Sequence, residues 1–291
     1  MSLIRTSTIM FIIVLVTLAM LHMVIGYGES PTEIGIRFAA KVGDQHAVCG
    51  QTYENIGASE SQLEITDLRF YVSNVRLINN AQEEVPFTLT QDNLWQYQNL
   101  ALLDFEDGSA HCRDTGNEPL NDQLTGSIPV GEYSGIRFDV GIPFELNHLD
   151  STTAPSPLNV GAMWWYWQDG YKFVRVDLLV NDNLWIFHLG STGCMASDFN
   201  IAPSKPCRNP NIAAIRLDDF NFETDVIVAD VGTLLATLDM AQSTEPGCMS
   251  EHGDADCRSV FPAFGLTQSA QPCSGDACVG QSFFRVDPSS E

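Results

Sequence analysis

Basic residues are scarce in this sequence: 14 lysines and arginines stand against 37 aspartates and glutamates, a net charge of −23. Such an acidic chain repels nucleic acid and anionic lipid, which excludes both as expected partners, although the same charge also favours solubility. A convincing helical period is missing, apart from a weak one at Gly232–Met240, so a helical bundle is excluded. Nucleophile elbows, phosphate-binding loops and zincin motifs are missing too, and we therefore do not expect an enzyme.

The first 28 residues have the pattern of an export signal. Arg5 precedes the almost wholly apolar run Ile9–Ile25, and two small glycines follow it. We expect residues 1–28 to be removed and residues 29–291 to form one mature domain, periplasmic or secreted, with no other membrane segment. An uncleaved membrane anchor is the alternative, although the run is at the short end for spanning a bilayer.

All eight cysteines follow the export signal, and an even number in an exported chain favours disulfides. Zinc is the rival interpretation, but the chain has no Cys-x-x-Cys pair. Eight cysteines allow 105 pairings, so the connectivity stays open. Proximity along the chain favours four: Cys194–Cys207, Cys248–Cys257, Cys273–Cys278 and, by remainder, Cys49–Cys112.

Short segments of alternating apolar residues recur along the chain and are separated by turn residues. This pattern predicts an all-β fold, an antiparallel β-sandwich. Beyond Ala241 the chain is rich in glycine, serine, proline and cysteine, and we expect a disulfide-tied, loop-rich C-terminal extension packed on the sandwich. The predicted strands are Ile34–Phe38, Leu63–Ile78, Val85–Leu89, Ala101–Phe105, Gly135–Ile142, Tyr171–Val180, Leu184–Leu189, Ala213–Phe220 and Val226–Ala229.

Aromatic residues concentrate in one segment. Three of the five tryptophans, Trp164, Trp165 and Trp167, lie within four residues, and His148 and His188 flank them. In an extended segment Trp165 and Trp167 share one face and could line one pocket. By composition alone, an indole cluster fits core packing as well as a binding surface, including a platform for carbohydrate.

The two flanking histidines predict a site for a soft metal ion. A lone histidine in a strand, such as His188, is more often structural, whereas His148 follows a strand in a loop, which favours function. Two neutral imidazoles are sufficient ligands for Cu(I), and the thioether of Met163 would suit it as a third. Convergent carboxylates for a hard ion are not apparent in the sequence.

Four motifs occur in a fixed order: Pro-Phe-x-x-Asn-His (143–148), Ala-Pro-Ser-Pro-Leu-Asn (154–159), Trp-x-Trp-Gln-x-Gly-Tyr-Lys-Phe (165–173) and Phe-His-Leu-Gly-Ser-Thr-Gly-Cys (187–194). With these motifs the chain, from about Glu33 to Phe284, resembles the MbnP-like copper-binding family, also called metallo-mystery-pair four-Cys-motif proteins. The four cysteines of that name match Cys49, Cys112, Cys194 and Cys207.

The resemblance implies an exported protein that binds one Cu(I) ion and acts in copper homeostasis. It also implies a partner, a dihaem cytochrome c peroxidase-like (MbnH-like) protein, which converts the first tryptophan of Trp-x-Trp to kynurenine. On this sequence that residue is Trp165, with Trp167 the second; Trp164 departs from the usual pattern by adding a third indole. His148 and His188 lie in the family's motifs. The alternative is an adhesion or glycan-binding β-sandwich without metal.

Overall fold

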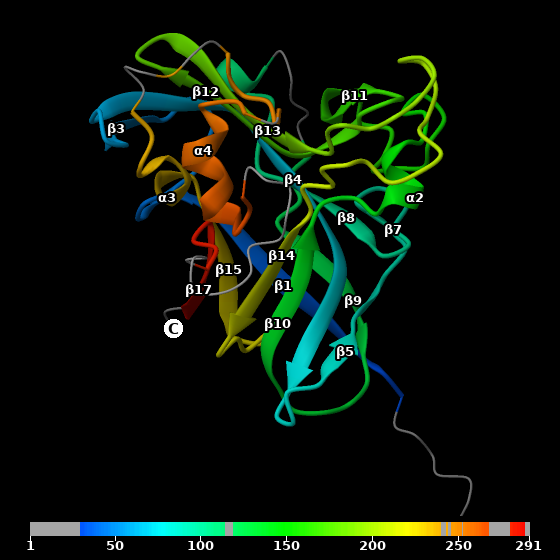
Figure 1. The fold of residues 1–291 in the computed structure, drawn as a ribbon. Coiled ribbons are helices and arrows are strands. Elements are labelled where there is room, and N and C mark those ends of the chain that lie inside the picture. Colours follow the sequence, from blue (N-terminus) through cyan, green and yellow to red (C-terminus); the bar gives the residue numbers. More distant parts are fainter. Residues whose placement is uncertain are drawn as a thin grey trace, which may run out of the picture.

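Two β-sheets pack face to face in the computed structural model, which describes residues 30–113, 119–239, 243, 246–251, 253–267 and 280–288 (Figure 1). The smaller sheet has six strands in the order β17-β15-β1-β9-β6, with β2 paired to β1. Its strands are β1 (Thr32–Val42), β2 (Gln45–His46), β6 (Thr88–Leu89), β9 (Gln123–Ile128), β15 (Asp225–Asp230) and β17 (Phe284–Pro288).

The larger sheet has eleven strands along the path β14-β10-β4-β12-β13-β16, with the other five paired beside it. At its centre the 19-residue strand β4 pairs with both β10 and β12. These strands are β3 (Thr52–Ile56), β4 (Ser61–Asn79), β5 (Glu84–Pro86), β7 (Gln96–Tyr97), β8 (Leu100–Asp104), β10 (Tyr133–Val140), β11 (Trp164–Tyr166), β12 (Gly170–Val180), β13 (Asn183–Gly190), β14 (Ala213–Asp218) and β16 (Gly247–Cys248).

An aromatic core joins the two sheets. The ring of Phe38 on β1 contacts Phe70 of β4 and Phe138 of β10 edge to face, with centroids 6.4 and 5.8 Å apart. Phe284 of β17 contacts Phe138 at 5.2 Å. Each of these side chains is at most 3% exposed. The core follows from the alternation of apolar residues along the strands, which confirms the prediction of an all-β sandwich.

The structure differs from the sequence-based prediction in three features. Val85–Leu89 divides into β5, which pairs with β4, and β6, which pairs with β9 of the other sheet. Pro86 lies at the division and has no N–H to continue a ladder. Two pairings are parallel, β1 with β15 and β13 with β16, within an otherwise antiparallel arrangement. Of the weak helical period at Gly232–Met240, the described residues include one helix, α3 (Val231–Leu235), which begins with Asp230 as its cap.

The C-terminal residues contribute to both sheets. β16 extends the large sheet next to β13, β17 extends the small sheet next to β15, and Phe264 and Phe283 are buried. Between them lie α4 (Cys257–Val260) and the 3-10 turn η3 (Phe261–Phe264). The expected C-terminal extension therefore adds a strand to each sheet and does not only pack on the outside of the sandwich.

The remaining helical segments are short: α2 (Phe144–Asn147), η1 (Ala110–Cys112) and η2 (Gly161–Met163). Figure 1 shows α2 and β11 together at one end of the large sheet, away from α3 and α4. Within the described residues no helix is long and apolar enough to cross a membrane. The predicted export signal, residues 1–28, lies outside the described residues.

Candidate metal centre

The indole cluster is built on a short hairpin at the start of β12. β11 pairs with β12 through Trp164↔Tyr171 and Tyr166↔Gly170, with a register irregularity between the two pairs. Because β11 ends at Tyr166, Trp167 lies in the following turn and leaves the strand alternation. Its ring packs edge to face on Trp164, with centroids 4.7 Å apart, so the expected pairing of Trp165 with Trp167 gives way to Trp164 with Trp167.

Trp165 packs separately, against the end of β13. The six-membered part of its ring lies so close to Gly190 that a Cβ atom at that position would collide with it. The ring centroid lies 6.5 Å from that of His188, tilted by 50°. The indole Nε1 is buried without a hydrogen-bond partner, which is a costly state for a donor. Of the three clustered indoles, Trp165 is thus the one that contacts a histidine ring.

His188 is held by a carboxylate on the neighbouring strand. Its Nε2 lies 2.6 Å from Oδ1 of Asp177, and its Nδ1 is buried without a partner. Burial lowers the pKa of His188 below its ordinary value, despite the opposing effect of Asp177. The neutral imidazole therefore donates Nε2–H to Asp177 and keeps a free lone pair on Nδ1. This leaves a nitrogen ligand in a fixed orientation.

Asp177 is the end of a buried row of charges that crosses β12 and β4 and reaches Glu106, just after β8. Arg175 donates to Asp177 at 2.6 Å and to Asp67 at 3.0 Å, and Arg69 joins Asp67 to Glu106. These side chains are all at most 9% exposed. The carboxylates therefore converge on guanidinium groups, and not on a place for a hard cation. In the low dielectric of the interior, this row fixes Asp177 and through it the ring of His188.

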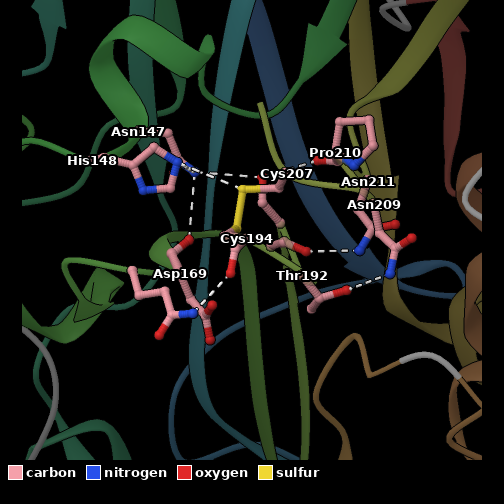
Figure 2. Close-up of a disulfide and its surroundings, with 12 residues drawn as sticks. Asn147, His148, Asp169, Thr192, Cys194, Cys207, Asn209, Pro210 and Asn211 are labelled. Carbon is pink, nitrogen blue, oxygen red and sulfur yellow. Dashed lines mark hydrogen bonds between the residues drawn. A yellow bond between two sulfur atoms is a disulfide. The ribbon is translucent and has the colours of Figure 1, made fainter. Parts of the chain in front are cut away.

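His148 lies on the other side of the hairpin, directly after α2. Its Nδ1 is 3.1 Å from the carbonyl oxygen of Trp167, and its Nε2 is 3.3 Å from the Asn147 amide and 3.7 Å from Sγ of Cys207 (Figure 2). Burial lowers the pKa of His148 as well. Its unprotonated nitrogen thus faces a disulfide, and no contact between the described residues joins it to His188.

Met163 occupies a place different from the one expected of a ligand. Its side chain is fully buried in the hydrophobic core. A different methionine, Met249, lines a pocket of about 170 Å³ next to Trp165. Nothing in the spacing of the sequence indicated this residue, because it lies directly after β16, far from Trp165 along the chain. The other residues that line the pocket are Tyr166, Asp169, Thr192 and Glu251.

Three of the four predicted disulfides are confirmed: Cys49–Cys112, Cys194–Cys207 and Cys248–Cys257. Cys273 and Cys278 lie outside the described residues. Two clusters within the described residues bring three groups of metal-binding type together: His148 with Cys194 and Cys207, and Asp254 with Cys248 and Cys257. Their sulfurs are disulfide-bonded and are poor ligands in that state.

Fold and site together define a disulfide-linked β-sandwich with histidine-containing candidate metal sites. A sequence model of the MbnP family matches residues 31–250, and the chain belongs to that family. A similar solved structure is that of MbnP from Methylosinus trichosporium, with a TM-score of 0.78 and 27% identity, covering 90% of this chain and 100% of that one. No curated protein matches the sequence. The resemblance inferred from the four motifs is confirmed.

Proposed function

We propose that this protein is exported and holds one Cu(I) ion, with Nδ1 of His188 as one ligand. His148 would be the second ligand once its ring turns away from Cys207, which its Nε2 faces in the structure. The observation that carries the proposal is the buried, unpartnered Nδ1 of His188, whose opposite nitrogen is fixed by Asp177. A carboxylate that accepts the far N–H of an imidazole is the usual support of a metal-bound histidine. The protein would store or deliver the ion in copper homeostasis, without catalytic turnover.

The donor atoms around Trp165 fit a soft monovalent ion. Neutral imidazole is a suitable ligand for copper, and the thioether of Met249 in the adjacent pocket has the softness that Cu(I) prefers. Met249 replaces Met163 as the favoured thioether, since Met163 is enclosed by the core. Asp169 and Glu251 line the same pocket and give it a negative rim that attracts cations.

Trp165 is the proposed target of oxidation to kynurenine. In that conversion the C2–C3 bond of the indole breaks, C3 becomes a ketone, and C2 leaves as formate, so that an aryl amine remains. The oxidant is hydrogen peroxide, used by a dihaem cytochrome c peroxidase-like partner: two molecules accept the four electrons of the ring cleavage, supply the two oxygen atoms of the N-formylkynurenine and leave two waters. One further water then hydrolyses the formyl group and releases the formate. The product replaces an N–H that has no partner by polar groups close to His188, and these can orient a metal-bound histidine.

The partner would dock on the loop that covers the indole cluster. Met195, Phe199 and Ile201 are 74, 66 and 49% exposed, an unusual concentration of large apolar side chains on one loop. The ring of Phe199 packs on Tyr166 with centroids 5.9 Å apart, and the backbone N–H of Gln168 donates to the Phe199 carbonyl. An oxidant seated on this loop would reach the indoles over a short distance.

The decisive experiment combines copper analysis with peptide mass spectrometry of residues 163–173, on protein purified from its own host. We expect one copper per chain and a kynurenine mass shift at Trp165. His188→Ala and His148→Ala, measured separately, should lose most of the copper. His111→Ala should retain it, because His111 is exposed and bonded to Glu64.

Full copper content in both histidine variants would refute the proposed ligands. Protein that carries no copper but binds oligosaccharides through Trp164 and Trp167 would support the glycan-binding alternative instead.

A further inference from the structure

A second group of residues that can bind a soft metal ion consists of His148 and the two cysteines of the Cys194–Cys207 disulfide. The imidazole Nε2 of His148 and the two sulfurs all lie within 4.8 Å of one another, and the three residues are at most 9% exposed. Figure 2 shows the ring of His148 directed at the sulfur of Cys207, with Asn147 beside it. Because Nδ1 donates to the Trp167 carbonyl, the unprotonated Nε2 lies on the side of the sulfurs, where it also accepts from the Asn147 amide at 3.3 Å.

The positions of the two cysteines do not depend on the S–S bond alone. Directly beside it, Thr192 and Asn209 exchange two backbone hydrogen bonds of 2.9 and 3.0 Å, and the N–H of Arg208 donates to the Gly193 carbonyl. The Asn209 amide adds a hydrogen bond to the Thr192 hydroxyl. These bonds would hold two separate thiols next to each other after the disulfide is opened.

The backbone of Cys194 is also anchored to the indole hairpin. The side-chain amide of Gln168 donates to the carbonyl of Cys194 at 2.8 Å. Between the two cysteines, however, the chain is exposed, and Met195, next to Cys194, is 74% accessible. A reductant or an ion would therefore approach from this loop, without disturbing the sandwich core.

We propose that reduction of Cys194–Cys207 creates a Cys2His site for a soft or borderline metal ion, with His148 as the nitrogen ligand. A dithiol reductant would supply two electrons and two protons by thiol–disulfide exchange, becoming a disulfide itself while Cys194 and Cys207 become thiols. An ion that binds displaces the two thiol protons. Two thiolates and one imidazole suit Cu(I), Zn²⁺ or Cd²⁺, and leave a further coordination position open.

This inference goes beyond the proposed copper site, which belongs to the oxidised protein and has no sulfur from cysteine. The other cluster, Cys248 and Cys257 with Asp254, offers a carboxylate in place of the imidazole and is the internal comparison. A test must therefore separate the two cystines and must detect the histidine.

The test is a titration of the full-length, reduced protein with Cd²⁺, followed by the ultraviolet sulfur-to-cadmium charge-transfer band. Four proteins are compared under the same reduction: the parent, Cys194→Ser with Cys207→Ser, His148→Ala, and His111→Ala as the matched histidine control. Near-ultraviolet circular dichroism reports whether each stays folded. The copper content of His188→Ala before reduction tests the proposed function separately, because this variant keeps all three groups of the reduced site.

We expect the parent and His111→Ala to bind Cd²⁺ alike, and the double serine variant to lose the part of the band due to this site. His148→Ala should bind roughly tenfold or more weakly, in line with the loss of one supported ligand. An unchanged affinity in His148→Ala, a band unaffected by the serine substitutions, or unfolding of the parent on reduction would each overturn the proposal.

Discussion

Nε2 of His188 on β13 lies 2.6 Å from Oδ1 of Asp177 on β12, and both side chains are buried. Asp177→Asn removes the negative charge from this pair while keeping the size of the side chain. We expect Cu(I) affinity to fall by about 10- to 100-fold, because the carboxylate both orients the imidazole and raises its basicity. Competition with a Cu(I) chelator measures the affinity. Glu132→Gln, on the surface, should leave it unchanged.

Trp165→Phe is expected to abolish the kynurenine mass shift and tight copper binding together. Phenylalanine keeps an apolar ring against Gly190, so the loss of packing should be smaller than for truncation to alanine. Mass spectrometry and copper analysis after co-expression with the partner provide both measurements. Trp164→Phe is the matched control, since Trp164 packs on Trp167 and not on a histidine. Copper binding that survives Trp165→Phe would show that oxidation is not required.

Asp104 predicts a pH dependence of stability. Burial raises the pKa of this carboxyl from 3.8 to about 8, and its Oδ2 has no hydrogen-bond partner. Between these values the folded chain binds a proton that the unfolded chain has released. Asp104 therefore contributes stability that is fully present below its unfolded pKa and is lost as pH rises through 8.

Asp104→Asn should remove that contribution to the pH profile, which cannot exceed ~1.4 kcal/mol per pH unit for one group. The variant should be less sensitive to rising pH than the parent in urea denaturation of the metal-free protein. Glu132→Gln serves as the exposed control. Parallel pH profiles for parent and Asp104→Asn would contradict the assignment.

The exposed loop offers a test of docking that spares the metal site. Phe199→Ser should slow oxidation of Trp165 by the partner, because it removes apolar area from the proposed contact, yet leave copper affinity of already oxidised protein intact. Leu184→Ser is the control: Leu184 is 54% exposed but lies at the distant start of β13. Equal oxidation rates in both variants would argue for docking elsewhere. Added salt should also slow the reaction if the acidic surface steers the partner.

The Cys49–Cys112 disulfide joins two residues that are 63 positions apart in the sequence, one in the turn after β2 and one in η1. Replacing both cysteines by alanine should lower the free energy of unfolding by about 2–5 kcal/mol, as removal of a native disulfide generally does. Urea denaturation measures the change, and thiol titration of the unfolded, unreduced parent should find no free cysteine. A stability equal to that of the parent would show that this bond does not support the sandwich.

Strand alternation was sufficient to predict most of the sandwich, because one face of nearly every strand is buried. Strand alternation did not predict the positions of those site residues that depend on tertiary contacts. Trp167 lies off the face of Trp165 because β11 ends at Tyr166, one residue before it. Met249 could not be found by spacing, since a parallel pairing of residues far apart in the chain brings it to the pocket. The role of Asp177 likewise depends on the pairing of β12 with β13.

The pairing of β16 with β13 also sets the order in which the site can be completed. Ser250 donates to the carbonyl of His188 and accepts from the N–H of Gly190, 62 and 60 residues earlier in the chain. Synthesis proceeds from the N-terminus, so the hairpin of Trp165 and the strand of His188 emerge well before the segment that closes the pocket over them. The proposed site for a metal ion is consequently incomplete until the chain has been made as far as Ser250, so metal loading would follow the pairing of β16 with β13.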